Sequence, residues 1–329
     1  MESLLFPIIA LFAAWVLGAL LTKMLIPALE KKQFKQFVRE VGPQSHLKKT
    51  GTPSMGGLAI ISASVICSLV VGIIAKSFTV ALVGVTVAMV LFGTIGFKDD
   101  YEKAIKKNND GLSPKQKVVM QFVFSLAFAV FVYFFASARG MEGSEIWIPV
   151  FNWTIDLGIL YIPFAMFVMI AFSNAVNLTD GLDGLASGVT ALVSFFMVIA
   201  SVSFGFADMS IIFGAVAGAC LGFLMFNKNP AKIFMGDTGS MALGGVISAG
   251  ALFMKLEFLI AIAGLIYVIE ALSVIIQVGY FKKTRKRIFR MAPIHHHFEL
   301  GGMSEKKVVV MFWGVTLVTC AIAIVLMNL

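Results

Sequence analysis

Charged residues are scarce in this sequence. Of its 329 residues only 13% are Asp, Glu, Lys or Arg, whereas 59% are hydrophobic. A soluble globular chain is typically about 45–50% apolar and about 25% charged. The composition is therefore that of an integral membrane protein rather than of a soluble domain.

Cysteine is almost absent. The three cysteines, Cys67, Cys220 and Cys320, each lie inside an apolar run, and none has a CxxC or Cys/His partner nearby. This pattern argues against a disulfide framework and against a zinc site. We therefore expect three small, buried, apolar side chains.

The first apolar segment lacks the features of a cleaved signal peptide. It has no basic region at its start, and Lys23 and Pro27 lie where a small-residue cleavage site would be expected. We therefore expect this segment to remain as a helix.

Long apolar runs, in contrast, fill most of the chain. A transmembrane helix needs about 20 mostly apolar residues, and ten runs approach that length. They lie at 4–29, 55–75, 78–97, 117–138, 157–176, 185–205, 209–226, 239–254, 257–280 and 306–328. The run 239–254 is short but rich in Gly and Ala, which allow close helix packing. The sequence thus predicts an all-α, polytopic membrane bundle of about ten transmembrane helices, forming one domain over residues 1–329.

Basic residues are unevenly divided between the two sides of this bundle. All but three of the 26 Lys and Arg residues fall in the odd-numbered loops and their flanking helix ends; the exceptions are Lys76, Arg139 and Lys255. The positive-inside rule places those loops in the cytoplasm and both termini outside. The net charge of +8 then indicates orientation and contact with anionic membrane lipids rather than nucleic acid binding.

The longest outer loop, residues 139–157, is rich in aromatic and β-branched residues. This composition predicts a short extracytoplasmic hairpin at the interface. Trp147 and Trp153 suit the membrane–water boundary.

Asp99 and Asp100 are adjacent carboxylates at the end of the third run. Like charges side by side repel, and a divalent cation or a phosphate-bound cation would relieve that repulsion. Successive helical side chains diverge by about 100°, so the pair need not share one ligand. A solvated helix end among lysines explains the pair equally well.

Asn177, Asp180 and Asp183 are spaced i, i+3, i+6 in the loop after the fifth run, so that on a helical turn they lie near one face. The loop has no basic residue, and Gly181 and Gly184 allow a ligand to approach closely. An Asp N-cap explains Asp183 but not the other two, which favours a functional role.

Asp237 follows Gly236 at the start of the eighth run, within the stretch GDTGS. A carboxylate at a glycine turn beside a helix N-terminus suits a metal or phosphate site. Helix capping alone is the simpler alternative, but it does not require the surrounding motif. We therefore favour a functional role for Asp237.

Three consecutive histidines, His295, His296 and His297, follow the basic stretch 282–290. Consecutive imidazoles cannot all point one way, so a closed tetrahedral zinc site is a poor fit. Hydrogen bonds to phosphate, or proton transfer by one imidazole, remain open. The basic stretch itself is typical of a face that contacts lipid headgroups.

Glu270 and Gln277 lie two turns apart inside the ninth run. Ionisable residues at this depth usually face the bundle or a cavity. We expect Glu270 to pair with a neighbouring helix or to shape a groove, ahead of any catalytic role.

The separate clusters share the predicted cytoplasmic side. Five carboxylates and three histidines meet there beside lysines, which suits a Mg²⁺-bound, phosphorylated substrate. The membrane setting suggests a lipid as the second substrate.

At these residues the sequence resembles the bacterial phospho-MurNAc-pentapeptide transferases, a branch of the polyprenyl-phosphate N-acetylhexosamine-1-phosphate transferase superfamily. The resemblance covers essentially the whole chain. The stretches GFKDD, NLTDGLDG and GDTGS resemble the superfamily, and APIHHHFE resembles this branch. The matching stretches are KKTGTPSMGG (48–57), GFKDD (96–100), GLSPKQK (111–117), NAVNLTDGLDGLA (174–186), FMGDTGS (234–240) and APIHHHFE (292–299).

The resemblance implies an activity and a setting. UDP-MurNAc-pentapeptide and undecaprenyl phosphate would react with Mg²⁺ to give lipid I and UMP, a step of peptidoglycan synthesis. The enzyme would lie in the bacterial inner membrane as a homodimer, with its active site facing the cytoplasm.

The resemblance also implies roles for single residues. Asp99 and Asp100 match an essential pair, one of which would deprotonate or orient the lipid phosphate, Asp237 matches the Mg²⁺ ligand, and His295 is a further catalytic candidate. Asn177 is a second candidate metal ligand. The implied substrate-binding residues are Lys49, Ser54, Lys115, Asn177, Asp180, Asp183, Asn227, Phe234, His296 and His297.

Three alternatives stay open at the level of sequence. Attack could be direct or pass through a phospho-aspartyl enzyme; direct attack is favoured because a phosphate monoester is already a nucleophile. A transferase using UDP-GlcNAc is disfavoured by APIHHHFE. A transporter or flippase would place ionisable residues near the midplane, where only Glu270 lies.

Overall fold

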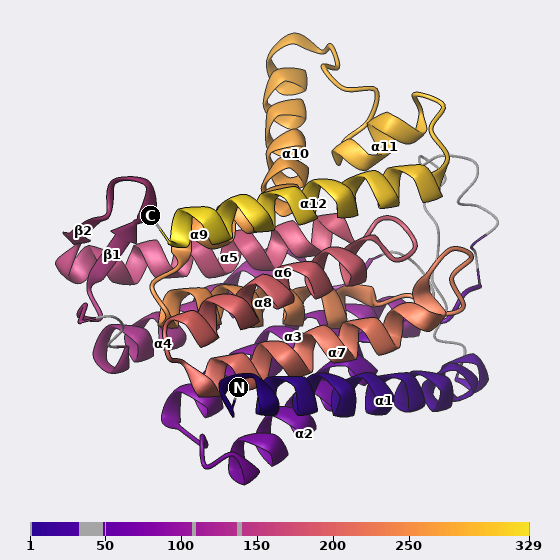
Figure 1. Ribbon diagram of the computed structural model, residues 1–329. Helices are drawn as coiled ribbons and strands as arrows, with labels where there is room; N and C mark the ends of the chain where they lie inside the picture. The colour runs from indigo at the N-terminus through magenta and orange to yellow at the C-terminus, as the bar shows by residue number, and fades with distance from the viewer. Residues whose placement is uncertain (1, 33–48, 50, 107–109, 137–139, 329) are drawn as a thin grey trace.

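The computed structural model describes residues 2–32, 49, 51–106, 110–136 and 140–328. Most helices run side by side along one direction, and a two-stranded hairpin lies at one end of them (Figure 1). The helices are α1 (Glu2–Lys31), α2 (Gly57–Ile74), α3 (Val80–Lys106), α4 (Pro114–Phe135), α5 (Tyr161–Thr179), α6 (Leu185–Ser203), α7 (Ala207–Asn227), α8 (Gly236–Phe253), α9 (Glu257–Ala263), α10 (Leu265–Thr284), α11 (Ile294–Glu299) and α12 (Glu305–Met327).

Nine helices of the described chain are long and apolar enough to cross a membrane, namely α1 to α7, α10 and α12. The chain is therefore a polytopic helical membrane protein, as the apolar runs predict. The prediction of ten exceeds this number by one, and the difference is α8. This helix opens with the polar residues of GDTGS, which lower its hydropathy.

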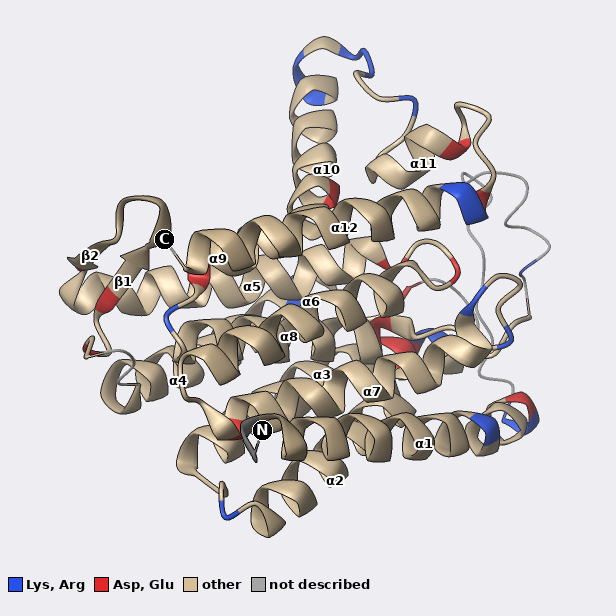
Figure 2. Ribbon diagram, in the orientation of Figure 1, with Lys and Arg blue, Asp and Glu red and all other residues tan. Residues whose placement is uncertain are grey.

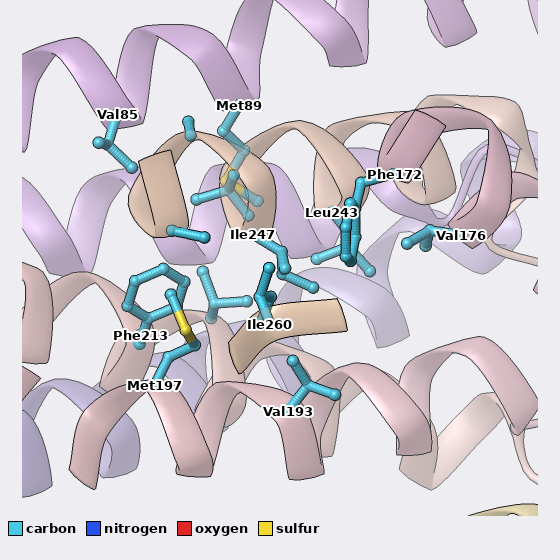
Figure 3. Close-up of a cluster of buried hydrophobic side chains, with 14 of the residues drawn as sticks. Val85, Met89, Phe172, Val176, Val193, Met197, Phe213, Leu243, Ile247 and Ile260 are labelled. Carbon is cyan, nitrogen blue, oxygen red and sulfur yellow. The ribbon is translucent and has the colours of Figure 1, made fainter. Parts of the chain in front are cut away.

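Helix α8 nevertheless lies deep in the bundle. Every residue from Thr238 to Phe253 is buried. Val85 and Met89 of α3, Phe172 and Val176 of α5 and Phe213 of α7 pack in one cluster with Leu243 and Ile247 of α8 (Figure 3). Its first turn, which carries Asp237, is therefore positioned by helices on several sides.

The ninth apolar run, predicted as one helix over 257–280, is two helices in the structure. Gly264 leaves helical geometry, with φ −91° and ψ 31°, and α10 then stands across the direction of α12 (Figure 1). The carbonyl of Ala263 at the break accepts a hydrogen bond from Thr319 Oγ1 of α12 at 3.0 Å. Hydropathy is continuous across this position, so the sequence gives no sign of the break that α12 stabilises.

The predicted hairpin is confirmed. Strand β1 (Glu145–Ile148) pairs antiparallel with β2 (Trp153–Asp156), with Ile148 opposite Trp153. Trp153 is exposed, but Trp147 is buried and donates through Nε1 to Asn152 Oδ1 at 3.0 Å. Of the two tryptophans predicted at the membrane–water boundary, only Trp153 therefore has an exposed side chain. The three cysteines are buried and unpaired, as expected.

The two ends of the bundle differ in charge. Helix α1 begins and α12 ends at the end where the hairpin lies, and that end carries few charged residues (Figure 2). Acidic residues gather at the opposite end, with Lys and Arg around them. The predicted division of basic residues between loops thus corresponds to two ends of one helix bundle.

Candidate active site

Three carboxylates meet at the charged end of the bundle. Asp99 and Asp100 lie near the C-terminal end of α3, and Asp237 lies in the first turn of α8. Each offers an oxygen, and these oxygens all lie within 4.8 Å of one another. Gly96 allows this approach, because a Cβ there would overlap the carbonyl of Asp237. The prediction ends this helix at residue 97, whereas α3 continues to Lys106, so both aspartates have helical geometry.

Asp100 is held by the N-terminus of α8. Its Oδ1 accepts the backbone N–H of Asp237 at 3.1 Å, and its Oδ2 accepts the N–H and hydroxyl of Thr238 at 2.9 and 2.7 Å. The first N–H groups of a helix have no partner within the helix, and the helix dipole favours a negative charge there. Asp100 therefore fixes the start of α8 against α3 and, with it, the position of Asp237.

Asp99 is held from two sides. Its Oδ2 lies 2.5 Å from Lys103 Nζ, one helical turn further along α3. Its Oδ1 accepts the backbone N–H of Leu112 at 2.8 Å. The second contact joins the carboxylate to the GLSPKQK stretch, at a residue 13 positions further along the chain.

Two lysines and an amide surround Asp237. Lys103 and Lys117 lie 3.1 and 3.2 Å from its Oδ2. Asn177, in the last turn of α5, donates from Nδ2 to Asp237 Oδ1 at 2.7 Å and to Ser240 Oγ at 2.9 Å. The structure thus brings Asn177 to Asp237, with the amide nitrogen facing the carboxylate.

The acidic cluster has the composition of a divalent cation site. Carboxylate oxygens are the ligands that Mg²⁺ prefers, usually one or two of them together with substrate phosphates. Three carboxylates face two lysines, which leaves negative charge in excess. Both oxygens of Asp100 already accept hydrogen bonds from the start of α8, so Asp99 and Asp237 are the better candidates to hold a cation.

A second polar network lies beside this cluster. Lys49 Nζ lies 2.7 Å from Asp183 Oδ1 and 2.5 Å from Glu305 Oε1 at the start of α12. Asn229 donates to the other oxygens of the same carboxylates, at 3.0 Å to Asp183 and 2.8 Å to Glu305. The loop carrying Asp183 is therefore fixed by segments from three distant parts of the chain.

Asn227 is wholly engaged by protein groups. Its Oδ1 accepts from Gly184 N at 3.1 Å and Ser187 Oγ at 3.0 Å, and its Nδ2 donates to Ile233 O at 3.0 Å. It joins the end of α7 to the turn that precedes α6. The side chain therefore holds two loops together, and its predicted contact with a substrate stays a prediction.

The stretches that contain Ser54 and Phe234 pair through their backbones. Phe234 N donates to Pro53 O, and Gly56 N donates to Phe234 O, both at 2.8 Å. The Ser54 hydroxyl is buried, has no partner among the described residues, and lies beside Gly236. Residues 53–57 and the FMGDTGS motif, which contains Asp237, thus form one structural unit.

Asp180 lies at the C-terminal end of α5, beyond the membrane-spanning segment. Burial raises its pKa well above the usual range, and the negative charges of Asp237, Asp100 and Asp183 raise it further. No basic side chain hydrogen-bonds to it within the described chain. Its carboxylate is the one acidic group of the motif that lacks a cationic partner there, so it is available to a cationic ligand.

The three histidines point in three directions, as the sequence predicts. His295 is buried, with Nδ1 3.0 Å from Glu270 Oε1. His296 Nδ1 lies 2.8 Å from Glu299 Oε2. His297 Nδ1 accepts the backbone N–H of Arg290 at 3.1 Å. Of the three, His295 is the one directed toward the interior.

Some residues of the site were not expected from the sequence. The structure brings Lys117 to Asp237, whereas Lys115 is exposed and contacts none of the three carboxylates. The i, i+4 spacing of Asp99 and Lys103 is a signal that could have identified Lys103. The sequence gives no signal for the contact of Glu305 with Asp183, because 122 residues separate the two.

Comparisons with known proteins show which family the chain belongs to. Residues 82–255 match the model of the glycosyl transferase family 4. The chain is 46% identical to the phospho-N-acetylmuramoyl-pentapeptide-transferase of Caldicellulosiruptor bescii over 322 residues, 98% of both chains. It is 47% identical to the proteins of that name from Clostridioides difficile, over 95% of both chains, and from Listeria monocytogenes, over 97% of this chain and 98% of the relative. The chain therefore belongs to the phospho-N-acetylmuramoyl-pentapeptide transferase family of membrane phosphoglycosyl transferases.

Proposed function

We propose that this protein transfers phospho-MurNAc-pentapeptide from UDP-MurNAc-pentapeptide to undecaprenyl phosphate, giving lipid I and UMP in peptidoglycan synthesis. Family membership over nearly the whole chain supports this reaction. The observation that carries it is the convergence of Asp99, Asp100 and Asp237 with two lysines at one end of an apolar helix bundle.

The proposal includes Mg²⁺ held by Asp237, with Asp99 as its neighbour and Asn177 orienting Asp237. The acceptor phosphate and the diphosphate are both anionic, so the reaction brings several negative charges together. A bound Mg²⁺ would offset that charge and orient the diphosphate. Lys103 and Lys117 lie beside the same carboxylates and would contact the phosphates.

Within this scheme the two adjacent aspartates have different roles. Both oxygens of Asp100 accept hydrogen bonds from the start of α8, so Asp100 organises the site. Asp99 is therefore the member that would accept a proton from the lipid phosphate or orient it. We retain direct attack by that phosphate, since a phosphate monoester is a nucleophile at neutral pH.

We assign the nucleotide to the region beside the cluster. Lys49, Asp183 and Phe234 lie on segments that meet there, and Asn227 links two of those segments. Ser54 and Asn227 stay predicted contacts of the substrate. Lys115 stays a predicted contact of the nucleotide and phosphates, and Asp180 stays a predicted residue of the nucleotide side of the cleft. His296 and His297 stay predicted contacts of the diphosphate and sugar.

The proposal extends to the placement of the chain in the membrane. We propose ten spans, with α8 as the eighth and α9 plus α10 as the ninth, in a single domain over residues 1–329. Both termini and the hairpin would lie outside, and the acidic cluster would face the cytoplasm of a bacterial cell. A homodimer within the lipid bilayer completes the proposal, and native mass spectrometry from lipid nanodiscs tests it.

Release of UMP tests the reaction. Purified protein in detergent with UDP-MurNAc-pentapeptide should release UMP only when both undecaprenyl phosphate and Mg²⁺ are present, and EDTA should stop it. Asp237→Ala should lower the rate at least about 1000-fold while the protein still elutes as a folded species. Asp156→Asn, which changes an exposed carboxylate of the hairpin, is the matched control.

Other outcomes would contradict the proposal in distinct ways. Equal turnover of UDP-GlcNAc in a competition assay would move the protein to a sibling specificity. Substrate uptake into proteoliposomes without UMP formation would favour a transporter. Near-normal turnover by Asp237→Ala would remove Asp237 as the metal ligand.

A further inference from the structure

A buried carboxylate and a buried imidazole meet where α10 passes α11. Glu270 is fully buried on α10, His295 is 1% exposed on α11, and Oε1 of the first lies 3.0 Å from Nδ1 of the second. The exposed basic stretch separates the two residues in sequence. An ionisable side chain inside an apolar helix is costly to bury, and a specific partner offsets that cost.

The other ring nitrogen of His295 is directed toward the loop that carries Asp180 and Asp183. His295 Nε2 is buried and has no hydrogen-bond partner among the described residues. It lies against Gly181, where a Cβ would overlap this nitrogen. The absence of a side chain at residue 181 therefore lets this nitrogen approach the loop that carries the acidic motif.

The contact with Glu270 determines which ring nitrogen of His295 can bind a ligand. An ionised carboxylate only accepts hydrogen bonds, so Nδ1 must be the protonated nitrogen that donates to it. A carboxylate behind a histidine fixes the tautomer and the ring orientation. Nε2 is then the nitrogen left to meet a ligand, and in an imidazolium ring this nitrogen is also a hydrogen-bond donor.

We propose that Glu270 is a positioning residue that holds His295 so that its Nε2–H donates to a phosphate oxygen of the sugar-nucleotide substrate. This inference rests on the proposed function, because it takes the substrate to be a diphosphate bound beside the acidic loop. Glu270 itself touches no substrate and acts through the imidazole. Gln277, on the same helix, has a different role. Its amide nitrogen donates to the carbonyl of Phe289, and its amide oxygen accepts from the N–H groups of Ile288 and Phe289.

Histidine NMR tests the orientation without any turnover. The chain has four histidines, so ¹⁵N-histidine spectra of the full chain in nanodiscs are simple, and His295→Ala identifies the signal of interest. We expect a protonated Nδ1 at His295 in the wild type and in Glu270→Gln, whose amide oxygen still accepts the N–H. In Glu270→Ala the ring should lose that preference and exchange between tautomers. An unchanged His295 signal in Glu270→Ala would overturn the proposal.

Kinetics test whether the carboxylate acts through the imidazole. We expect Glu270→Ala to lower kcat for UMP release by about 10–100-fold, with a smaller loss for Glu270→Gln. In the double variant Glu270→Ala/His295→Ala, the rate should stay within about 3-fold of His295→Ala alone, because the partner is already absent. Losses that multiply would show a role independent of His295 and overturn the proposal.

A control on the same helix separates this effect from general damage to α10. Tyr267→Phe removes the buried hydrogen bond, 2.7 Å long, between Tyr267 and Thr190. It should leave both the His295 signal and kcat unchanged, and a loss equal to that of Glu270→Ala would overturn the proposal. If wild-type protein releases no UMP, the proposed function fails, whereas the NMR result still decides the role of Glu270.

Discussion

Two ammonium groups approach the same carboxylate oxygen of Asp237. Lys103 belongs to α3 and Lys117 to α4, so the carboxylate joins two helices as well as two charges. Charged donors placed where negative charge develops are typically worth about 10²–10³ in rate. The position of each lysine relative to Asp237 therefore has a measurable consequence.

Lys117 and Lys115 form a natural pair for mutation, since they lie two residues apart at the start of α4. We expect Lys117→Ala to lower kcat for UMP release by about 100-fold, because the substrate phosphates lose a cation at Asp237. Lys115→Ala should cost less, since its side chain is exposed and contacts none of the carboxylates. Steady-state rates of UMP release by both variants test this prediction. A larger loss of rate in Lys115→Ala would show that the phosphates do not bind beside Lys117.

Asp180 links the site to stability. The pKa of the Asp180 carboxyl is higher in the folded protein than in the unfolded chain. Between these two pKa values the folded state binds more protons than the unfolded state, so the free energy of unfolding falls as the pH rises. We therefore expect Asp180→Asn to unfold at a higher temperature than wild type in EDTA. The difference should widen as the pH is raised from about 4, the pKa of an unfolded aspartate, through the neutral range, while UMP release decreases. Thermal unfolding curves across this range test the sign; a constant difference would contradict it.

At the scale of elements, the contact between α3 and α8 sets the distance between the carboxylates. Gly96 lies against the backbone of α8 at Asp237, where nothing larger than hydrogen fits. Overpacking a tight contact typically costs about 1–3 kcal/mol. Because backbone rather than a flexible side chain is the neighbour, the two helices must separate.

Gly96→Ala should accordingly lower the free energy of unfolding by about 1–3 kcal/mol and reduce UMP release strongly. Gly279→Ala on α10 is the matched control, because a Cβ there has open space around it. That substitution should be neutral or stabilising by up to about 1 kcal/mol. Denaturant unfolding in micelles measures the free energy of unfolding of both variants. Equal effects of the two substitutions would contradict a specific role for the contact between Gly96 and α8.

The whole molecule separates an end rich in charged residues from an end with few of them, and this separation predicts its orientation. We expect Val150→Cys, exposed in the hairpin, to react with a membrane-impermeant maleimide on intact cells. Lys286→Cys, exposed beyond α10, should react only after the cells are opened. The three native cysteines are buried and give little background. The reverse labelling pattern would invert the topology.

Much of the architecture could be predicted because hydropathy and charge act locally. A run of about 20 apolar residues must satisfy its backbone within itself in a bilayer, so it forms a helix whatever its neighbours are. The hairpin followed from composition in the same way. Helix α8 was predicted as a helix although its first turn is polar. The break at Gly264 was not predicted, because its stabilising partner Thr319 lies on another helix.

In the candidate site, too, some features could be predicted from the sequence and others required the structure. The sequence by itself determined that Asp99, Asp100, Asn177 and Asp237 belong to motifs of one family, because their identity and spacing carry that information. Only the tertiary structure decided that Asp100 holds the start of α8, that Lys117 approaches Asp237, and that Glu270 faces His295. Charge and hydropathy are summed along the chain, whereas these contacts depend on angstrom-scale packing between helices that are distant in sequence.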